Sequence, residues 1–532
     1  MTAANKKNVT ESWINVGINA GILFVYGALT LIGILNHELW IDEAQAWNIA
    51  RDNNLSGILA AMKYEGHPPL WHFILYVFAH MGLSCMAVSV ISWCISVASV
   101  AVILYKFPFA LPLKLTIIFS SGFLFYNSVV SRVYCLVILL LCIIAVMYGK
   151  RREHPVLFGF LVALLANTHI CICGIVGAIG IIMITDLVKG WKNNSKKENI
   201  MSLIGLGIAG IGVLLLVGIL FNSMGYNSDI GRKSYSFYKV IDKIIYSLED
   251  ISYCAIFNST TMNMGVGLIL LLAELCFIAM LVLLWRWRRA FFIEMSFIVF
   301  YIITCEVIWF TLPGRAALFI FSYAFSLCIA YGESASEGIK CTYSGSSHIV
   351  KRLVEDYKWL HKHALRAVGV MLAVVCALTV PAGASYLFGD YSGDFNVTKK
   401  SAEFVRANIE KDAVLVSNSD NLVEISAYLP EYKMYSFEYA DYYTYVSHKK
   451  HSKEIDVDKI KNELSRYEHI YYVYTYLWDG VDDCDKLSEN IIFMADGGMK
   501  MYANMNFICI AKVDIDQLED IAGRYSEYLK DN

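Results

Sequence analysis

Charged residues are scarce in this chain of 532 residues, where they make up 17% of the sequence against 57% for hydrophobic residues. So much apolar surface exceeds what the core of one soluble domain can bury. The composition therefore excludes an ordinary soluble protein and predicts a membrane protein with several transmembrane helices. The formal net charge of -3 gives no support for nucleic-acid binding.

Several familiar sequence patterns are also missing. Neither G-x-x-x-x-G-K-[ST] nor G-x-G-x-x-G occurs in a strand-to-helix context, so the chain shows no cradle for a nucleotide phosphate. It has no C-x-x-C pair of the metal-site type, and Cys171 and Cys173 lie in an apolar run where thiols pack as small apolar groups. No internal repeat is visible. A phosphorylated donor, if one is used, is therefore expected to be lipid-linked and to approach through the bilayer.

Long apolar runs predict about eleven transmembrane helices. The first, residues 13–36, follows Lys6 and Lys7 and lacks a small-residue cleavage site, which predicts an anchor rather than a signal peptide. A polar break at residues 167–169 divides one long apolar stretch into two short spans. The later runs begin near Cys85, Pro112, Val133, Pro155, Ile170, Ile200, Gly265, Ala290, Arg315 and Ala367.

The positions of Lys and Arg predict the orientation in the cell membrane. With a cytoplasmic N-terminus, the basic loops at 149–152, 189–197, 286–289 and 340–366 all fall inside, as the positive-inside rule requires. An odd number of spans then leaves the C-terminal part of the chain outside the cytoplasm.

The composition becomes charged and tyrosine-rich near residue 389. We therefore divide the chain into a transmembrane domain, residues 1–388, and a soluble extracytoplasmic domain, residues 389–532. In the second domain apolar runs alternate with helix-like stretches, which predicts an α/β layer structure. The predicted strands are 413–416, 433–437, 469–474 and 507–513, and the predicted helices are 421–428, 457–466 and 516–530.

Two features of this domain have weaker implications. Cys484 and Cys509 can pair in an oxidising compartment, but the sequence does not place them together. The acidic cluster at 479–485 lacks the ligand spacing and the closing Glu of a calcium loop, so we interpret it as a solvated turn.

The loop of residues 37–84 carries most of the candidate chemistry. It contains the adjacent carboxylates Asp42 and Glu43, then Glu65 and His67 before two prolines and an amphipathic segment predicted to lie on the membrane surface. An ionised Asp42 can act as general base for an acceptor hydroxyl, while a second carboxylate orients the acceptor. Alternatively, Asp42 caps a helix, with Gln45 three residues later as in a capping box.

Aromatic side chains accompany these groups. Trp40, Trp47, Trp71 and Tyr64 lie in the same loop. Interface anchoring is the favoured interpretation, because tryptophan belts are common at membrane surfaces, and stacking on sugar rings is the alternative.

Three further polar residues stand at predicted outer ends of spans. They are Arg132, in the sequence S-R-V-Y that ends at Tyr134, His169, and Arg315 in P-G-R. Outer arginines run against the positive-inside bias, and ionisable groups at membrane depth usually have a partner. A lipid phosphate is a suitable partner, because guanidinium groups bind its oxygens bidentately and stabilise it as a leaving group. Interfacial snorkelling, a structural ion pair or, for His169, a packed histidine are the alternatives.

Taken in order, these motifs resemble the C-type membrane glycosyltransferases (GT-C fold), the superfamily that includes protein O-mannosyltransferases and the lipid A aminoarabinose transferase. The resemblance covers residues 10–335. It consists of Asp42-Glu43 after the first span, G-H-P-P-L-W at 66–71, S-R-V-Y at 131–134, and Arg315 at the start of a late span.

The resemblance implies transfer of a sugar from a polyprenyl-phosphate donor to an extracytoplasmic acceptor, which can be an envelope glycan, a lipid or a protein. Asp42 would be the catalytic base, with inversion at the anomeric carbon, and Glu43 the second carboxylate. His67 departs from the aminoarabinose transferase, which has a phosphate-binding lysine there. No cofactor is implied. Because some relatives with this architecture depend on a metal, the alternative is that Asp42, together with Glu43 or Glu65, holds a divalent cation. The substrate- and phosphate-binding candidates are Glu65, His67, Arg132, Tyr134, His169 and Arg315.

Two other functions are alternatives to a transferase. A transporter or flippase would place polar residues near mid-span and often show inverted repeats, whereas the candidates here lie at one interface. A catalytically silent scaffold of an envelope assembly complex is the third hypothesis. The sequence does not specify the sugar, the acceptor or the polyprenyl chain.

Overall fold

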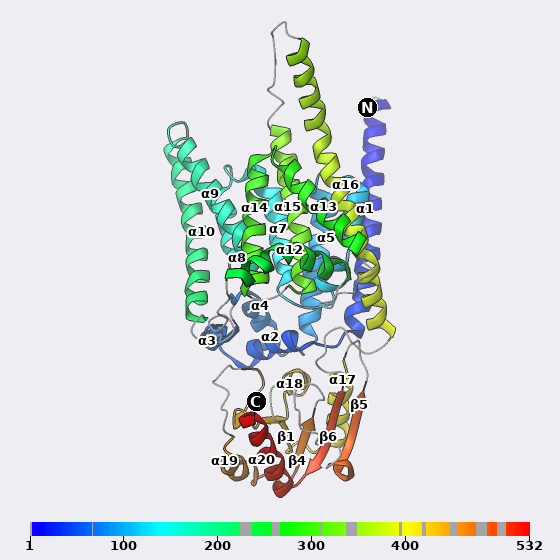
Figure 1. The fold of residues 1–532 in the computed structure, drawn as a ribbon, viewed down its shortest axis with the longest axis vertical. Helices are drawn as coiled ribbons and strands as arrows, with labels where there is room; N and C mark the ends of the chain where they lie inside the picture. Colours follow the sequence, from blue (N-terminus) through cyan, green and yellow to red (C-terminus); the bar gives the residue numbers. More distant parts are fainter. Residues whose placement is uncertain are drawn as a thin grey trace.

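The structure, a computed structural model, is a long helical bundle with a smaller sheet-containing domain at one end (Figure 1). The N-terminus lies at the opposite end of the bundle from this domain (Figure 1). The described residues are 3–65, 67–223, 237–257, 267–308, 311–336, 348–392, 396–417, 422–446, 455–474, 487–496 and 507–531.

Among the described residues, seven helices are long and apolar enough to cross a membrane. Each contains an apolar segment of at least 18 residues, which extends about 27 Å at 1.5 Å per residue. The chain is therefore a multi-pass membrane protein. The seven helices are α1 (Ala3–Asn36), α5 (Ala87–Lys106), α9 (Cys173–Gly190), α10 (Lys196–Ser223), α13 (Gly267–Leu284), α15 (Pro313–Ser336) and α16 (His348–Ser392).

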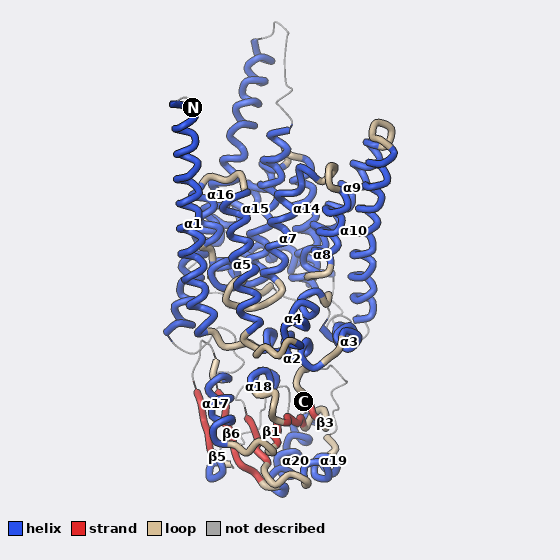
Figure 2. The backbone as a smooth tube through the Cα atoms, turned by 180° about the vertical axis from the view of Figure 1, so that it is seen from behind, coloured by secondary structure: helices blue, strands red, loops and turns tan. Residues whose placement is uncertain are grey.

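The other four predicted spans are shorter helices that pack against the long ones. They are α6 (Leu111–Ile118), which is followed by a π-helical turn, α7 (Tyr134–Met147), α8 (Pro155–Ala166) and α14 (Arg288–Ile302). Three of them, α7, α8 and α14, are labelled in Figure 2. The predicted break at 167–169 is confirmed, because α8 ends at Ala166 and α9 begins at Cys173. Helix α12 (Phe237–Phe257), which the sequence analysis did not predict, packs against α13 and α15.

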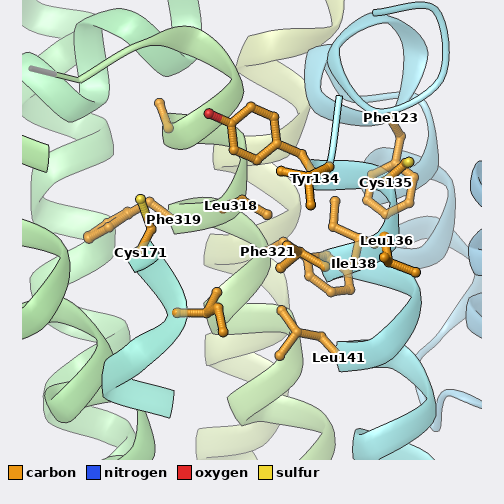
Figure 3. Packing of buried hydrophobic residues seen from close by; sticks show 14 of the residues in the cluster. Phe123, Tyr134, Cys135, Leu136, Ile138, Leu141, Cys171, Leu318, Phe319 and Phe321 are labelled. Carbon is orange, nitrogen blue, oxygen red and sulfur yellow. The ribbon is translucent and has the colours of Figure 1, made fainter. Parts of the chain in front are cut away.

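Apolar packing forms the centre of the bundle. Leu136 and Ile138 of α7 face Phe321 of α15 in a continuous buried cluster (Figure 3). Helices α8 and α10 are in close backbone contact at Gly159, which has no side chain. A β-carbon at this position would lie only 2.0 Å from the carbonyl oxygen of Gly205. Such small-residue contacts replace the hydrophobic driving force that is missing between helices in lipid.

Three short helices lie between the bundle and the sheet-containing domain (Figure 1). They are α2 (Ile41–Asp52), α3 (Leu55–Glu65) and α4 (Leu70–His80). Helix α4 is the amphipathic segment predicted after the two prolines, and it packs against α2. Since Asp42 is in the first turn of α2, the candidate carboxylates sit at this junction.

The C-terminal domain contains a six-stranded sheet in the order β3-β2-β1-β4-β6-β5. Strand β1 runs parallel to β2 and β4, and the other pairs are antiparallel. The strands are β1 (Val414–Ser417), β2 (Lys433–Ser436), β3 (Asp441–Tyr442), β4 (Ile470–Tyr474), β5 (Ile491–Asp496) and β6 (Phe507–Val513). The helices are α17 (Thr398–Asn408), α18 (Val423–Tyr428), α19 (Val457–Leu464) and α20 (Ile515–Asp531).

The four predicted strands and three predicted helices of this domain are all present, and β3, β5 and α17 are additional. Strands β1 and β4 are buried along their whole length, which explains why they appear in the sequence as continuous apolar runs. The acidic cluster at 479–485, with Cys484, lies outside the described residues, as does the side chain of Tyr64.

Buried polar contacts attach this domain to the loop of residues 37–84. Asn48 of α2 donates to the carbonyl oxygen of Val423 at 2.9 Å and to the hydroxyl of Ser426 at 2.8 Å. The backbone N–H of Leu39 donates to the hydroxyl of Tyr428 at 2.8 Å. Because buried polar groups need their partners, these bonds fix α18 against α2. The helix that carries Asp42 is thus held from both the bundle and the C-terminal domain.

Candidate functional site

Helix α2 begins with a cap formed by Glu43. The carboxylate of Glu43 accepts the backbone N–H of Trp40 at 2.8 Å, and a negative charge in the first turn also interacts favourably with the helix dipole. The alternative in which Asp42 caps the helix and pairs with Gln45 is therefore wrong. The side chain of Gln45 instead exchanges hydrogen bonds with the backbone of Val446.

Glu43 is also the centre of a buried polar network. One of its oxygens accepts the backbone N–H of Ser131, and the other lies 3.1 Å from Nε2 of His37. The second ring nitrogen of His37 lies 2.8 Å from the carboxylate of Asp390. All three ionisable groups are fully or almost fully buried. The network thus joins the ends of α1 and α16 to the start of α2 and to the residue before Arg132.

This network predicts a loss of stability at alkaline pH. Burial lowers the pKa of His37, but the carboxylates of Asp390 and Glu43 outweigh it and raise the pKa to about 10. The folded protein therefore holds this proton more tightly than the unfolded chain, where the pKa is about 6.5. The contribution is complete below pH about 6.5 and is lost as the pH rises to about 10.

Thermal unfolding in lipid nanodiscs between pH 6 and pH 10.5 checks this expectation. The free energy of unfolding should fall by a few kcal/mol across this range, on the order expected for a shift of this size. A His37→Gln variant should be less stable at pH 6 and show a flatter dependence on pH. Parallel curves for the two proteins would contradict the assignment.

Asp42, next to Glu43 in sequence, has a different environment. Its carboxylate lies 2.8 Å from Nη2 of Arg132, and its side chain is 41% exposed. The guanidinium of Arg132 lies over two rings, 5.3 Å from the centroid of Trp40 and 5.2 Å from that of Tyr134. The ion pair that the sequence left open as an alternative is present, and it joins two residues predicted for the same site. Asp42 is accessible, whereas Glu43 is not.

Tyr134 connects Arg132 to the two remaining candidates. Its ring centroid is 5.2 Å from that of His169. On its other side, Gly314 lets the first turn of α15 approach closely, because a β-carbon there would lie 3.0 Å from Cε2 of Tyr134. Arg315 follows directly and interacts with the Tyr134 side chain. Tyr134 is therefore the common neighbour of both arginines and the histidine.

His169 is held as a neutral imidazole. Its Nδ1 accepts the backbone N–H of Cys171 at 3.1 Å, which leaves Nε2 to carry the proton. Burial lowers the pKa of His169 well below its usual value, and nearby positive charges lower it further. Those charges include the guanidinium groups of Arg315 and Arg132. Arg132 and Arg315, from distant parts of the sequence, thus both act on this ring.

Glu65 and His67 form a second group beside the first. The carboxylate of Glu65 accepts a hydrogen bond from Gln45 at 2.7 Å and lies 3.4 Å from Nε2 of His67. Although burial raises the pKa of Glu65, its hydrogen bond and ionic contact with His67, together with His72 and Gln45, lower it to about 2. Gln45 is one helical turn after Asp42, so Glu65 lies close to α2.

Two buried residues of this region, His72 and Glu424, were not predicted from the sequence. The ring of His72 stacks on that of His67 at 5.4 Å, and neither of its nitrogens has a hydrogen-bond partner among the described residues. Glu424 of α18 is buried beside the N-terminus of α2, where it accepts a hydrogen bond from Thr398 at 3.1 Å. Burial and the charges of Glu43 and Asp42 raise its pKa to about 8. The hydrophobic pattern of the sequence does not indicate a role for Glu424, because Glu424 belongs to a short helix far from α2 in the sequence.

The tryptophans of the loop differ from the prediction. Trp47 and Trp71 are 1% and 3% exposed and pack inside the protein, so neither is an interface anchor. Only Trp40 is partly exposed, and it stacks on Arg132. The two buried rings support the loop rather than facing a sugar or lipid.

Metal binding was the alternative for the carboxylates. In the described part of the chain, no three His, Cys, Asp or Glu side chains are grouped to hold a metal ion. Glu43 is directed at Ser131 and His37 rather than at Asp42.

An apolar groove of about 470 Å³ opens beside the candidate residues. It lies between the loop helices α3 and α4 and the bundle helices α8 and α10, and its walls are almost entirely apolar. Asn167, two residues before His169, lines the groove together with Leu70 and Phe73. A larger cavity of about 870 Å³ lies near Arg152 at the start of α8, and none of the candidate residues lines it.

Comparisons with known proteins give a likeness in structure. No family model and no curated protein matches the chain. A crystal structure of ArnT from Cupriavidus metallidurans bound to undecaprenyl phosphate is 12% identical, with a TM-score of 0.47 over 94% of this chain and 98% of that chain. The apo state of the same protein gives 12% identity and a TM-score of 0.46 over 93% and 98%.

Proposed function

We propose that the protein is an integral membrane glycosyltransferase that moves a sugar from a polyprenyl-phosphate donor to an extracytoplasmic acceptor. The observation that carries the proposal is the position of the accessible Asp42 carboxylate 2.8 Å from Arg132, in a cluster that extends through Tyr134 to His169 and Arg315. A carboxylate beside several groups that favour an anion suits a reaction in which a hydroxyl loses a proton and a phosphate leaves.

In this mechanism Asp42 accepts the proton of the acceptor hydroxyl as its oxygen attacks the anomeric carbon. The bond between that carbon and the phosphate oxygen breaks, and the electron pair stays on the lipid phosphate. Arg132 and Arg315 stabilise the phosphate charge, and Nε2–H of His169 donates a hydrogen bond to it. Attack from the face opposite the phosphate inverts the anomeric configuration.

The ion pair between Asp42 and Arg132 belongs to the free enzyme in this proposal. In the free enzyme Arg132 is the ion-pair partner of Asp42. A donor phosphate then competes for the guanidinium of Arg132 and releases the Asp42 carboxylate from its ion pair. Donor binding thus prepares the base for the acceptor.

Glu43 has a positioning role in this mechanism. Its hydrogen bonds to the backbone of Trp40 and Ser131 and its contact with His37 occupy both oxygens. Since Trp40 and Ser131 adjoin the α2 start and Arg132, the Glu43 carboxylate sets the distance between Asp42 and Arg132. It does not reach the reacting atoms.

The apolar groove between α3, α4, α8 and α10 suits the polyprenyl chain. Its apolar walls match a hydrocarbon, and its Asn167 end is two residues from His169. A lipid seated there would carry its phosphate to the cationic cluster without leaving the bilayer. We place the Asn167 end of the groove at the extracytoplasmic side of the membrane, because the distribution of Lys and Arg predicts that orientation.

Arg315→Gln is expected to weaken binding of undecaprenyl phosphate about 10- to 100-fold, because a charged hydrogen bond to phosphate is lost. Binding to the purified protein in nanodiscs is measured by thermal shift, with undecaprenol as the uncharged ligand of equal chain length. Arg289→Gln, in the Asp186 cluster, is the matched control and should bind as the wild type does. If the wild type bound undecaprenyl phosphate and undecaprenol with equal affinity, the proposal of a phosphate site would be refuted.

The transferase activity itself is tested in cells. Mass spectrometry of envelope glycans, lipids and proteins, with and without the protein, should reveal one sugar modification that disappears with it. The corresponding polyprenyl-phosphate sugar should accumulate. Identical profiles in the two strains, under conditions where the protein is produced, would refute the proposal.

A further inference from the structure

The C-terminal domain has its own cavity, which the proposed reaction does not use. It has a volume of about 570 Å³ and lies at the β2–β3 side of the sheet, beside the residues that follow α19. Five of its lining residues are tyrosines, including Tyr442 and Tyr467, and two are the cations Lys433 and Arg466. None of the lining residues is Asp or Glu. We call this cavity the tyrosine pocket.

The cations and phenols of the tyrosine pocket form a connected network. The hydroxyls of Tyr442 and Tyr467 lie 2.8 Å apart, and each accepts a hydrogen bond of 3.1 Å, from Arg466 and Lys433 respectively. Nζ of Lys433 also lies 5.2 Å from the ring centroid of Tyr467. Arg466 has an ion-pair partner in Glu463. Among the described residues, no ion pair joins a carboxylate to Lys433, and its ammonium group donates to the Tyr467 hydroxyl.

The tyrosine pocket is joined to the helix that carries Asp42. The hydroxyl of Thr444 donates to Asp52 at 2.5 Å, and that of Tyr445 donates to Asn53 at 3.3 Å. Asp52 is the last residue of α2, and Asp42 is in its first turn. The 12 residues of α2 extend about 18 Å, a distance that an oligosaccharide can span.

We propose that the tyrosine pocket binds an acidic saccharide, a chain whose sugars bear carboxylates. Aromatic rings offer flat apolar faces to sugar rings, and fixed cations select a negatively charged ligand over a neutral one. A pocket of this size with a few convergent polar groups is typical of a small-ligand site. On the proposed transferase function, on which this part rests, the pocket holds the acceptor chain while its end reaches Asp42.

Titration of the full-length protein in nanodiscs with trigalacturonic acid tests the proposal, with maltotriose as the neutral probe. Saturable binding of the acidic probe is expected, at least 10-fold tighter than that of maltotriose. The double variant Lys433→Gln with Arg466→Gln should lose this preference. Lys512→Gln is the matched control, since Lys512 lies 5.7 Å from the ring centroid of Tyr471 but does not line the pocket.

The outcomes separate this inference from the proposed function. Equal binding of both probes, or unchanged binding by the double variant, would overturn the acidic-saccharide site even if the wild type transfers sugar. Binding that depends on Lys433 and Arg466 in a protein without transferase activity would keep the site and refute the enzyme. An Asp42→Asn variant should bind trigalacturonic acid as the wild type does.

Discussion

Replacing Asp42 with Asn should lower the rate of sugar transfer by a factor of about 10² to 10⁴, the range for loss of a positioned general base. The Asn side chain has the same shape and can still accept a hydrogen bond from Arg132, but it cannot take the proton of the acceptor. Because Asp42 is 41% exposed and its ion pair is accessible to water, the free energy of unfolding should change by less than about 1 kcal/mol.

Three measurements on Asp42→Asn are needed together. Initial rates in proteoliposomes give the turnover, thermal shift gives the affinity for undecaprenyl phosphate, and the melting temperature reports the fold. Asp458→Asn, at an exposed position of α19, is the matched control and should retain full activity. Turnover like that of the wild type would refute Asp42 as the base. Loss of donor binding together with turnover would instead show that Asp42 acts by holding Arg132.

The adjacent pair Asp42-Glu43 shows how far the sequence can identify a site. Both residues appear equivalent there, since each is a carboxylate directly after a span. Successive residues of a helix point about 100° apart, so in α2 one faces Arg132 and the other faces the buried His37. The sequence locates the pair. Which of the two carboxylates is accessible depends on the residue at which α2 begins, because that sets the direction of each side chain.

The fold was predictable where the signal is local. Long apolar runs give the bundle helices, and the apolar run of β4 gives a buried strand. Helices α6 and α14 are shorter than the spans predicted for them, because a hydropathy window does not detect where a turn interrupts an apolar run. His72 and Glu424 were missed because their roles depend on contacts between distant segments.

Glu43→Gln should have a large effect of a different kind, on stability first and on activity through it. The carboxylate accepts from donors on both oxygens: the N–H groups of Trp40 and Ser131, and the protonated His37. A Gln side chain must turn its own NH₂ group toward one of these donors and removes one of the two carboxylates that contact the His37 ring. Breaking such a buried pair costs about 3–5 kcal/mol of unfolding free energy.

The readouts for Glu43→Gln distinguish a positioning residue from a reacting one. If Glu43 positions Ser131 and Arg132, the variant should melt at a lower temperature and bind undecaprenyl phosphate more weakly. It should also lose less stability than the wild type between pH 6.5 and pH 10, because the raised pKa of His37 depends partly on Glu43. Glu527→Gln, at an exposed position of α20, should change none of these. A variant that folds and binds donor normally yet has no turnover would instead make Glu43 a reacting carboxylate. The two roles therefore separate by whether stability and donor affinity fall together with the rate.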